Sequence, residues 1–205
     1  MEKKVLYHVE KRAMEWNADL PVDLKEAIEE IEKDYQRKGI NISFSAKRFE
    51  KPERLNANAG FFRSSKIVFS PEWAAYLLFR NDDTVTNAFL STLGHELSHK
   101  EKFIYPFFYP FDFTFVAWTN EVYADFNSGK HFLNNDRQRL INGMQFKLKK
   151  KGEDIEDNTH PSWQRRIYYA ENFESFNEDL ILQIAKDARC KDKKLIQKII
   201  NYYKD

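Results

Sequence analysis

Two histidines stand four residues apart in the segment GHELSHKE, which runs from Gly94 to Glu101. In an α-helix, residues i and i+4 lie on the same face, so His95 and His99 can both direct a ring nitrogen at one metal ion. Glu96 would then lie beside that ion, where it can take a proton from water. The pattern therefore predicts a helix that carries a metal site; the alternative is a solvent-facing pair of histidines.

The residues around this pair also favour a helix. The segment NDDT, residues 81–84, offers side chains that cap a helix N-terminus, and the helix is expected to continue to about Lys102. Three leucines between positions 90 and 97 fall on the side of a helical wheel nearly opposite the two histidines. We therefore expect the leucines to anchor the helix and the histidines to face a cleft.

A third metal ligand is available in the segment TNEVYADF. A catalytic zinc site uses three protein ligands and leaves a fourth position for water. Glu121 lies 22 residues after His99 and can supply the third ligand. Asp125 follows one helical turn later, where its carboxylate can accept the remaining ring N–H of a metal-bound histidine. The alternative is an ordinary exposed acidic face of a helix.

Composition excludes several other classes of protein. The 205 residues fit one compact domain, and 33 Lys and Arg against 32 Asp and Glu leave a formal charge of +1. This balance creates no field that would attract a nucleic acid or an anionic membrane, so a nucleic-acid partner is not expected. Cys190 is the only cysteine, which excludes an internal disulfide and a cysteine-rich metal site.

No segment of the sequence is expected to enter or cross a membrane. The first 16 residues are too densely charged for a signal peptide. The most apolar run, Phe103 to Trp118, is broken by prolines and an aspartate and is shorter than the ~20 residues of a membrane-spanning helix. We therefore expect a soluble, cytoplasmic protein. The nine aromatic residues of this run could form core, line an apolar substrate pocket or contact another subunit.

The order of the expected elements favours an α+β fold. Helical spacing from Val22 to Lys38 precedes a strand over residues 40–49 and a second short strand, SKIVFS, over residues 65–70. Further helices are expected over residues 119–133, 136–152 and 161–173, and two short ones from 177 onward. Strands early in the chain and helices late predict a small N-terminal sheet and a mostly helical C-terminal half within one domain, residues 1–205.

The segments HELSH and EVYAD, in this order, resemble the HExxH and ExxxD motifs of gluzincin metallopeptidases. Two further features are similar to the HtpX and CAAX-prenyl-protease-like branch of that family. These are the pair Asn58-Ala59 before the active helix and an H-P-x-x-x-x-R-I segment, here His160 to Ile167. The similarity extends from about Asn56 to Ala170. Members of that branch usually carry transmembrane helices, and none is expected here, so their membrane-protein substrates are not carried over.

The resemblance implies a zincin-like fold and a zinc-dependent peptidase that acts on a protein or peptide substrate. It assigns Zn²⁺ to the three residues already singled out, His95, His99 and Glu121. Glu96 would be the general base and acid, and Asp125 would orient a metal-bound histidine. His160 and Arg166 would bind the oxyanion of the tetrahedral intermediate or hold the cleft glutamates in place. His160, just before a proline, could instead be a plain helix cap.

The strand SKIVFS suggests a way of binding substrate. An exposed edge strand beside a zinc-binding helix can pair with an extended peptide and align its scissile bond over the metal. On this interpretation Ile67, Val68 and Phe69 bind substrate. The compatible alternative is an ordinary strand of the sheet.

Two alternatives concern regulation. ImmA-type repressor-cleaving peptidases and phage-exclusion peptidases of the Lit kind share E-x-x-A-D-like segments, so the chain could be a regulatory protein with a metallopeptidase-like core. Residues 175–205 show a helix-turn-helix rhythm around Ile184 to Ile199, in which Arg189 replaces the turn glycine. We expect this segment to be a closing helical pair packed on the core, with a DNA-binding appendage as the alternative.

Overall fold

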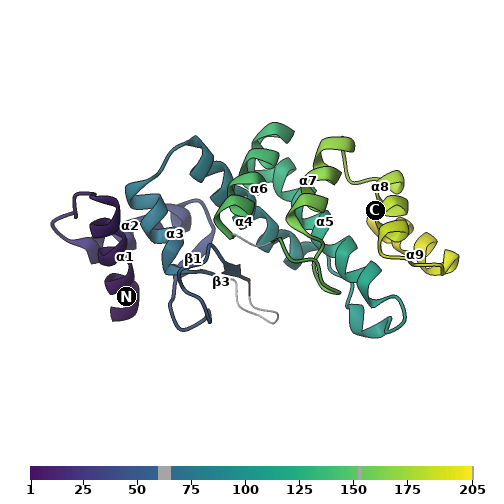
Figure 1. Cartoon of the computed structure of the whole chain (residues 1–205), viewed down its shortest axis with the longest axis horizontal. Helices are drawn as coiled ribbons and strands as arrows, with labels where there is room; N and C mark the ends of the chain where they lie inside the picture. The colour runs from purple at the N-terminus through teal and green to yellow at the C-terminus, as the bar shows by residue number, and fades with distance from the viewer. Residues whose placement is uncertain (60–65, 152–153, 205) are drawn as a thin grey trace.

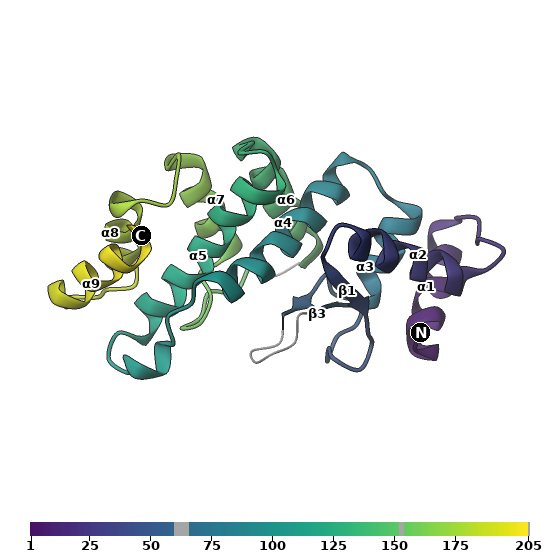
Figure 2. The ribbon, with the colours of Figure 1, turned by 180° about the vertical axis from the view of Figure 1, so that it is seen from behind.

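The computed structural model describes residues 1–59, 66–151 and 154–204. Within these residues the chain forms nine α-helices, one 3-10 turn and a three-stranded mixed sheet, which confirms the predicted α+β class. The N-terminal helices lie at one end of the long axis, the sheet lies between them and the middle, and the last two helices, α8 (Glu178–Asp187) and α9 (Lys193–Lys204), lie at the other end (Figure 1 and, from behind, Figure 2).

The sheet is built from three short strands, β1 (Asn41–Phe44), β2 (Ala57–Asn58) and β3 (Lys66–Phe69). β1 pairs with β3 in parallel, and β2 pairs with β3 antiparallel, which gives the order β1-β3-β2. β1 is shorter than the predicted strand over residues 40–49 because its partner β3 ends where Pro71 begins the next helix. A proline has no N–H to continue the ladder.

The expectation that residues 67–69 form an exposed edge strand is wrong for the described sheet. β3 is its central strand, between β1 and β2. Ile67 and Phe69 are fully buried in the core, and Val68 is half-buried. Ser65, the first residue of the predicted strand, lies outside the described residues. The edge strand that contacts the histidine-bearing helix α4 (Asp83–Glu101) is β2.

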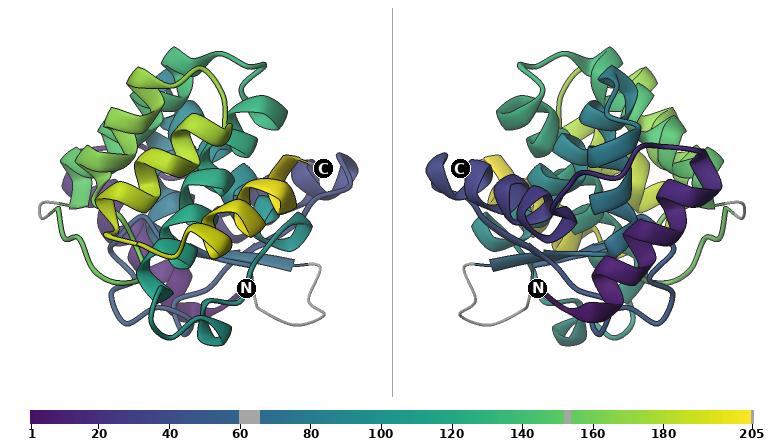
Figure 3. Two further views of the ribbon diagram at one scale, coloured as in Figure 1. Left: turned by 90° about the vertical axis from the view of Figure 1, so that its right-hand side faces the viewer. Right: turned by 90° about the vertical axis from the view of Figure 1, so that its left-hand side faces the viewer.

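The first core packs the sheet against four helices. These are α1 (Lys3–Trp16), α2 (Leu24–Arg37), α3 (Pro71–Phe79) and α4. Helix α1 was not predicted, although Val5, Val9 and Ala13 recur at helical spacing and are all buried. Viewed from its two ends, the molecule carries most of its helices on one side of the sheet (Figure 3).

Helix α4 begins and ends close to the predicted positions. Asp82, within the predicted capping segment, accepts a hydrogen bond from the N–H of Val85 at 2.8 Å and so caps the first turn. Leu90, Leu93 and Leu97 all pack in the first core, as their position on the helical wheel predicted. This anchorage fixes the rotation of α4 about its axis, and with it the direction of the two histidines.

Helix α5 (Phe113–Phe132) starts before the predicted position at residue 119. The earlier turns form because Phe115 and Trp118 extend the apolar face into a second core. The aromatic run, Phe103 to Trp118, is therefore divided between two elements. Its last part belongs to α5, and its first part contains a 3-10 turn, Pro106–Phe108. Phe107 and Phe108 of this turn are exposed.

Two more helices complete the middle of the molecule, α6 (Arg137–Lys151) and α7 (Trp163–Asn172). α6 packs against α4, and α7 packs against α6 and α5. Gly152, the last residue of the predicted helix over 136–152, lies outside the described residues. Together α4 to α7 surround the predicted metal site.

The closing helices α8 (Glu178–Asp187) and α9 (Lys193–Lys204) share the second core with α5 and α7. Ile184 and Ile199, which marked the helix-turn-helix rhythm, are buried in this core. Arg189, between the two helices, adopts the left-handed conformation with φ of 59°. None of the helices in the described residues combines the length and apolarity needed to cross a bilayer.

Helices α4 and α5 lie in close contact at Gly94. A Cβ atom at this position would lie 2.6 Å from Cδ2 of Phe132, 2.7 Å from Cβ of Ser128 and 2.9 Å from its Cα. Carbon atoms in contact normally stay about 3.5–4.0 Å apart. Only glycine therefore allows this helix crossing, which lies directly beside His95.

We expect Gly94→Ala to lower the free energy of unfolding by about 2–3 kcal/mol, because the added methyl group must push α4 and α5 apart. Chemical denaturation followed by circular dichroism measures this change. Gly129→Ala is the matched control on α5. Its Cβ would meet only flexible atoms of the Leu140 side chain, the nearest at 3.3 Å. Equal stability of the two variants would contradict the steric argument.

Candidate metal centre

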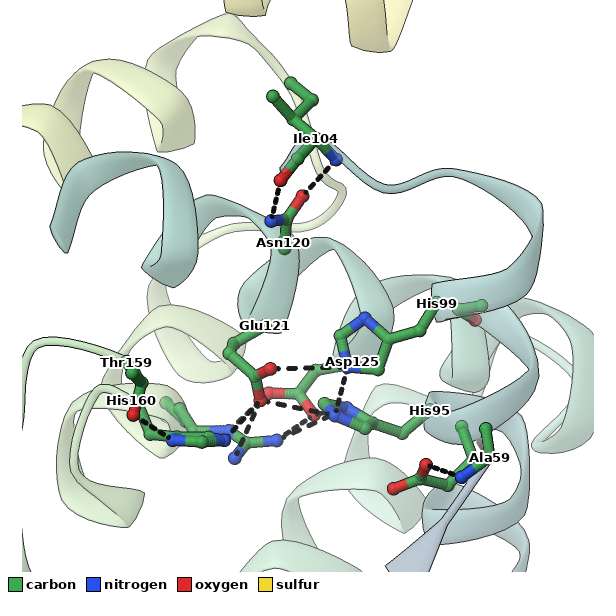
Figure 4. Close-up of polar contacts among 12 residues, drawn as sticks. Ala59, His95, His99, Ile104, Asn120, Glu121, Asp125, Thr159 and His160 are labelled. Carbon is green, nitrogen blue, oxygen red and sulfur yellow. Dashed lines mark hydrogen bonds and ion pairs between the residues drawn. The ribbon is translucent and has the colours of Figure 1, made fainter. Parts of the chain in front are cut away.

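Three side chains from α4 and α5 converge on one point. His95 and His99 project from one face of α4, and Glu121 faces them from α5 (Figure 4). The Nε2 atoms of the two histidines are 3.0 Å apart. Each lies 3.3 Å from a carboxylate oxygen of Glu121, His95 from Oε2 and His99 from Oε1. The three residues whose types and spacing predicted a metal site are thus brought together.

These separations fit a metal ion. Bonds of about 2.0–2.1 Å in a tetrahedral arrangement place neighbouring ligand atoms about 3.3 Å apart. Two imidazole nitrogens and one carboxylate oxygen suit zinc and also other divalent transition metals. The group of His95, His99 and Glu121 can therefore hold a metal ion.

Asp125 and Arg166 contact this group and hold its side chains in position. Nδ1 of His95 lies 2.9 Å from Oδ1 of Asp125, which directs the other ring nitrogen of His95 at the metal position. Arg166 of α7 donates to both oxygens of Asp125, at 2.7 Å from Nε and 2.5 Å from Nη2. Its Nη1 also lies 3.8 Å from Oε2 of Glu121. Arg166 therefore holds Asp125 by hydrogen bonds and lies at ion-pairing distance from one cleft glutamate, Glu121.

The buried carboxylates create a negative potential at the metal position. Burial acts to lower the pKa of His95, but Glu121 and Asp125 outweigh it and raise that pKa to about 9. Burial acts to raise the pKa of Glu121, but His95 and His99 hold it well below its usual value. Without a metal, a proton on His95 is the cation that this potential favours, and a metal ion would replace it.

Glu96, the expected general base, is half-buried on α4, and its side chain is hydrogen-bonded to the backbone at the end of the edge strand β2. Its Oε2 accepts a hydrogen bond of 2.8 Å from the N–H of Ala59, the residue after β2 (Figure 4). Ala59 belongs to the Asn58-Ala59 pair singled out in the sequence. Glu96 is also among the carboxylates that raise the pKa of Arg166 against the effect of burial. Through Glu96, helix α4 is therefore hydrogen-bonded to the residue that follows the edge strand β2.

His160 faces the metal position from the loop before α7. Its Nε2 lies 3.8 Å from Oε2 of Glu121, and its side chain is 56% exposed. The loop is held by Asp157, whose Oδ1 accepts from the backbone N–H groups of Thr159 and His160 at 2.7 and 2.8 Å. Nδ1 of His160 contacts the hydroxyl of Thr159 at 2.7 Å. The capping residue of α7 is Ser162, so His160 is not its cap.

Lys147 of α6 is a buried charged residue that the sequence did not single out. Its Nζ donates to Thr92 at 3.2 Å and lies 4.6 Å from the ring centre of Trp163, whose ring is also 4.1 Å from the guanidinium of Arg166. Burial and, less strongly, Arg166 lower the pKa of Lys147 to about 7. No sequence motif marks this lysine, because only the packing of α6 on α4 brings it near the site.

The chain was compared with protein-family models, with curated protein sequences and with solved structures, and none of the three comparisons found a match.

Replacement of Asp125 by asparagine is expected to weaken zinc binding about 10–100-fold, because the partner that orients His95 loses its charge. It should also destabilise the metal-free protein, since Arg166 keeps its buried charge without a full counter-charge. Competition with a chelator measures the affinity. Glu171→Gln removes the same charge from the exposed surface of α7 and should change neither property. Unchanged zinc affinity in Asp125→Asn would contradict the supporting role.

Proposed function

We propose that this chain is a zinc-dependent peptidase of gluzincin type, with a zincin-like fold, that hydrolyses peptide bonds of a protein or peptide substrate. The observation that carries the proposal is the group of His95, His99 and Glu121, whose ring nitrogens lie 3.0 Å from each other and 3.3 Å from carboxylate oxygens of Glu121. Glu96, which a purely structural metal site would not need, follows the first ligand directly. The resemblance of the motifs to gluzincins supports the same class.

Zinc in this site would polarise the carbonyl of the scissile bond and lower the pKa of a water molecule. Glu96 accepts a proton from the attacking water and delivers it to the amine nitrogen as the carbon–nitrogen bond breaks. Asp125 keeps the proton of His95 on Nδ1, so that Nε2 stays available as a ligand. Arg166 keeps Asp125 and Glu121 in position.

His160 is the residue that we assign to the developing oxyanion. Negative charge grows on the carbonyl oxygen during attack, and a hydrogen-bond donor placed beforehand stabilises it. The side chain of His160 is 56% exposed, whereas the donors of Arg166 are buried against Asp125. His160 can therefore reach a substrate, and Arg166 acts through its neighbours.

Glu96→Gln should leave a folded protein that binds about one zinc per chain and hydrolyses peptides 10²–10⁴-fold more slowly, roughly the contribution of general acid–base catalysis. Elemental analysis measures the zinc, and a fluorescence-quenched peptide library measures hydrolysis. Glu121→Gln, in contrast, should lose most of its zinc. Hydrolysis that persists in pure Glu96→Gln protein would remove the mechanism, and equal zinc in wild type and Glu121→Gln would remove the proposed ligand set.

For His160→Ala we expect retained zinc, an unchanged fold and a kcat about 10²-fold lower, with a smaller change in KM, because the donor acts mainly in the transition state. His160→Gln, which restores an N–H donor, should recover part of kcat. Loss of zinc in His160→Ala would instead identify His160 as a ligand, and an unchanged kcat would exclude it from the reaction.

A further inference from the structure

An apolar pocket of about 280 Å³ lies between the aromatic segment that follows α4 and the last helix, α9. One wall is formed by residues 103–105, 108 and 109, and the other by residues 198, 199 and 202. Most of the lining side chains are aromatic or aliphatic, and Lys198 is the charged one among the described lining residues. An apolar cavity of about 150 Å³ is large enough to bind benzene, so this pocket has room for an aromatic side chain.

The pocket shares a wall with the metal centre. The ring of Phe103, which lines the pocket, packs edge-on against the ring of the metal ligand His99, with 5.7 Å between ring centres and 82° between the planes. Beyond it, the ring of Tyr105 lies 5.4 Å from Phe103. The apolar surface of the pocket therefore begins one side chain away from the metal position.

Asn120, the residue directly before the ligand Glu121, is hydrogen-bonded to both segments that form the walls of the pocket. Its side chain accepts from the N–H of Ile104 at 3.0 Å and donates to the carbonyl of Ile104 at 2.7 Å (Figure 4). The same Oδ1 accepts from the hydroxyl of Tyr203 on α9 at 2.8 Å. Asn120 itself is buried. The position of the pocket relative to the metal ligands is thus determined by direct hydrogen bonds.

The residues that line the pocket favour some side chains of a bound peptide over others. Aromatic walls bind aromatic and large aliphatic groups by burial of apolar surface. Nζ of Lys198 lies at the pocket and donates to the hydroxyl of Tyr109 at 3.0 Å, and no carboxylate is found among the described lining residues. A lysine or arginine side chain would therefore meet a like charge without a counter-ion.

We propose that this pocket binds one aromatic or large aliphatic side chain of the peptide substrate and so sets the cleavage specificity. An extended peptide advances at most about 3.3–3.6 Å per residue, so the side chain that passes Phe103 belongs to a residue within about three positions of the scissile bond. The proposal rests on the proposed peptidase function for its substrate class. The pocket itself is independent of catalysis and can be tested apart from it.

The first test maps cleavage sites. The zinc-loaded full chain is incubated with a library of mixed-sequence peptides, the product ends are identified by mass spectrometry, and Glu96→Gln protein gives the background. We expect Phe, Tyr, Leu and Met to be enriched about tenfold at one position within three residues of the cleaved bond, the low end of the discrimination that apolar pockets achieve. Lys and Arg should be depleted at that position.

Three variants connect this preference to the pocket. Phe108→Ala and Tyr202→Ala each remove part of a wall and should reduce the enrichment severalfold. Phe107→Ala is the matched control, because Phe107 is the neighbouring residue, is 82% exposed against 77% for Phe108, and does not line the pocket. Cleavage without an apolar preference, or a preference that both wall variants leave unchanged, would overturn the proposal while the peptidase function stands.

A second measurement decides the case in which wild-type protein cleaves nothing. Zinc-loaded Glu96→Gln protein is titrated calorimetrically with acetyl-Gly-Gly-Phe-Gly-Gly-amide and with the matched peptide that carries alanine in place of phenylalanine. The phenylalanine peptide should bind about tenfold more tightly, and Phe108→Ala in the same background should remove most of this difference. Equal affinities for the two peptides would overturn the pocket assignment, whatever the outcome of the hydrolysis assay.

Discussion

The close approach of α4 and α5 is the constraint on which the rest of the structure depends. Gly94 allows α4 to lie directly against Ser128 and Phe132 of α5. Glu121 and Asp125 of α5 can therefore reach His95 at hydrogen-bonding and ion-pairing distance. On the opposite side α4 is anchored in the first core by its leucines. The helix is thus held from both sides, with its histidines directed at α5.

The second requirement is the balance of buried charge. Asp125 and Arg166 are both almost fully buried, and each would be costly to bury without the other. Their pairing fixes α7 against α5 and places the carboxylate that orients His95. Burial acts to raise the pKa of Asp125, but Arg166 and His95 hold it far below its usual value, so this residue stays ionised. The carboxylate that orients His95 is therefore ionised and held in place by a buried arginine of the chain itself.

Local sequence predicted much of this arrangement. The cap at Asp82 and the leucine face of α4 were visible because they depend on side chains within one or two turns. The separation of the ligand residues and the i+4 relation of Glu121 to Asp125 were visible for the same reason. Helix α1 was missed, although its apolar residues recur at helical spacing, because the dense charge between them dominated the interpretation of that segment.

The sequence by itself determined most of the helices and the chemical types of the residues that could hold a metal ion, because both follow from helical periodicity and from the donor atoms of histidine and glutamate. Tertiary structure alone decided that β3 is a central strand, since strand order depends on pairing between distant segments. It also brought Lys147 beside Trp163, and joined the aromatic segment to α9 around Asn120. These contacts link residues that no local pattern relates, so only the packing of helices on one another could reveal them.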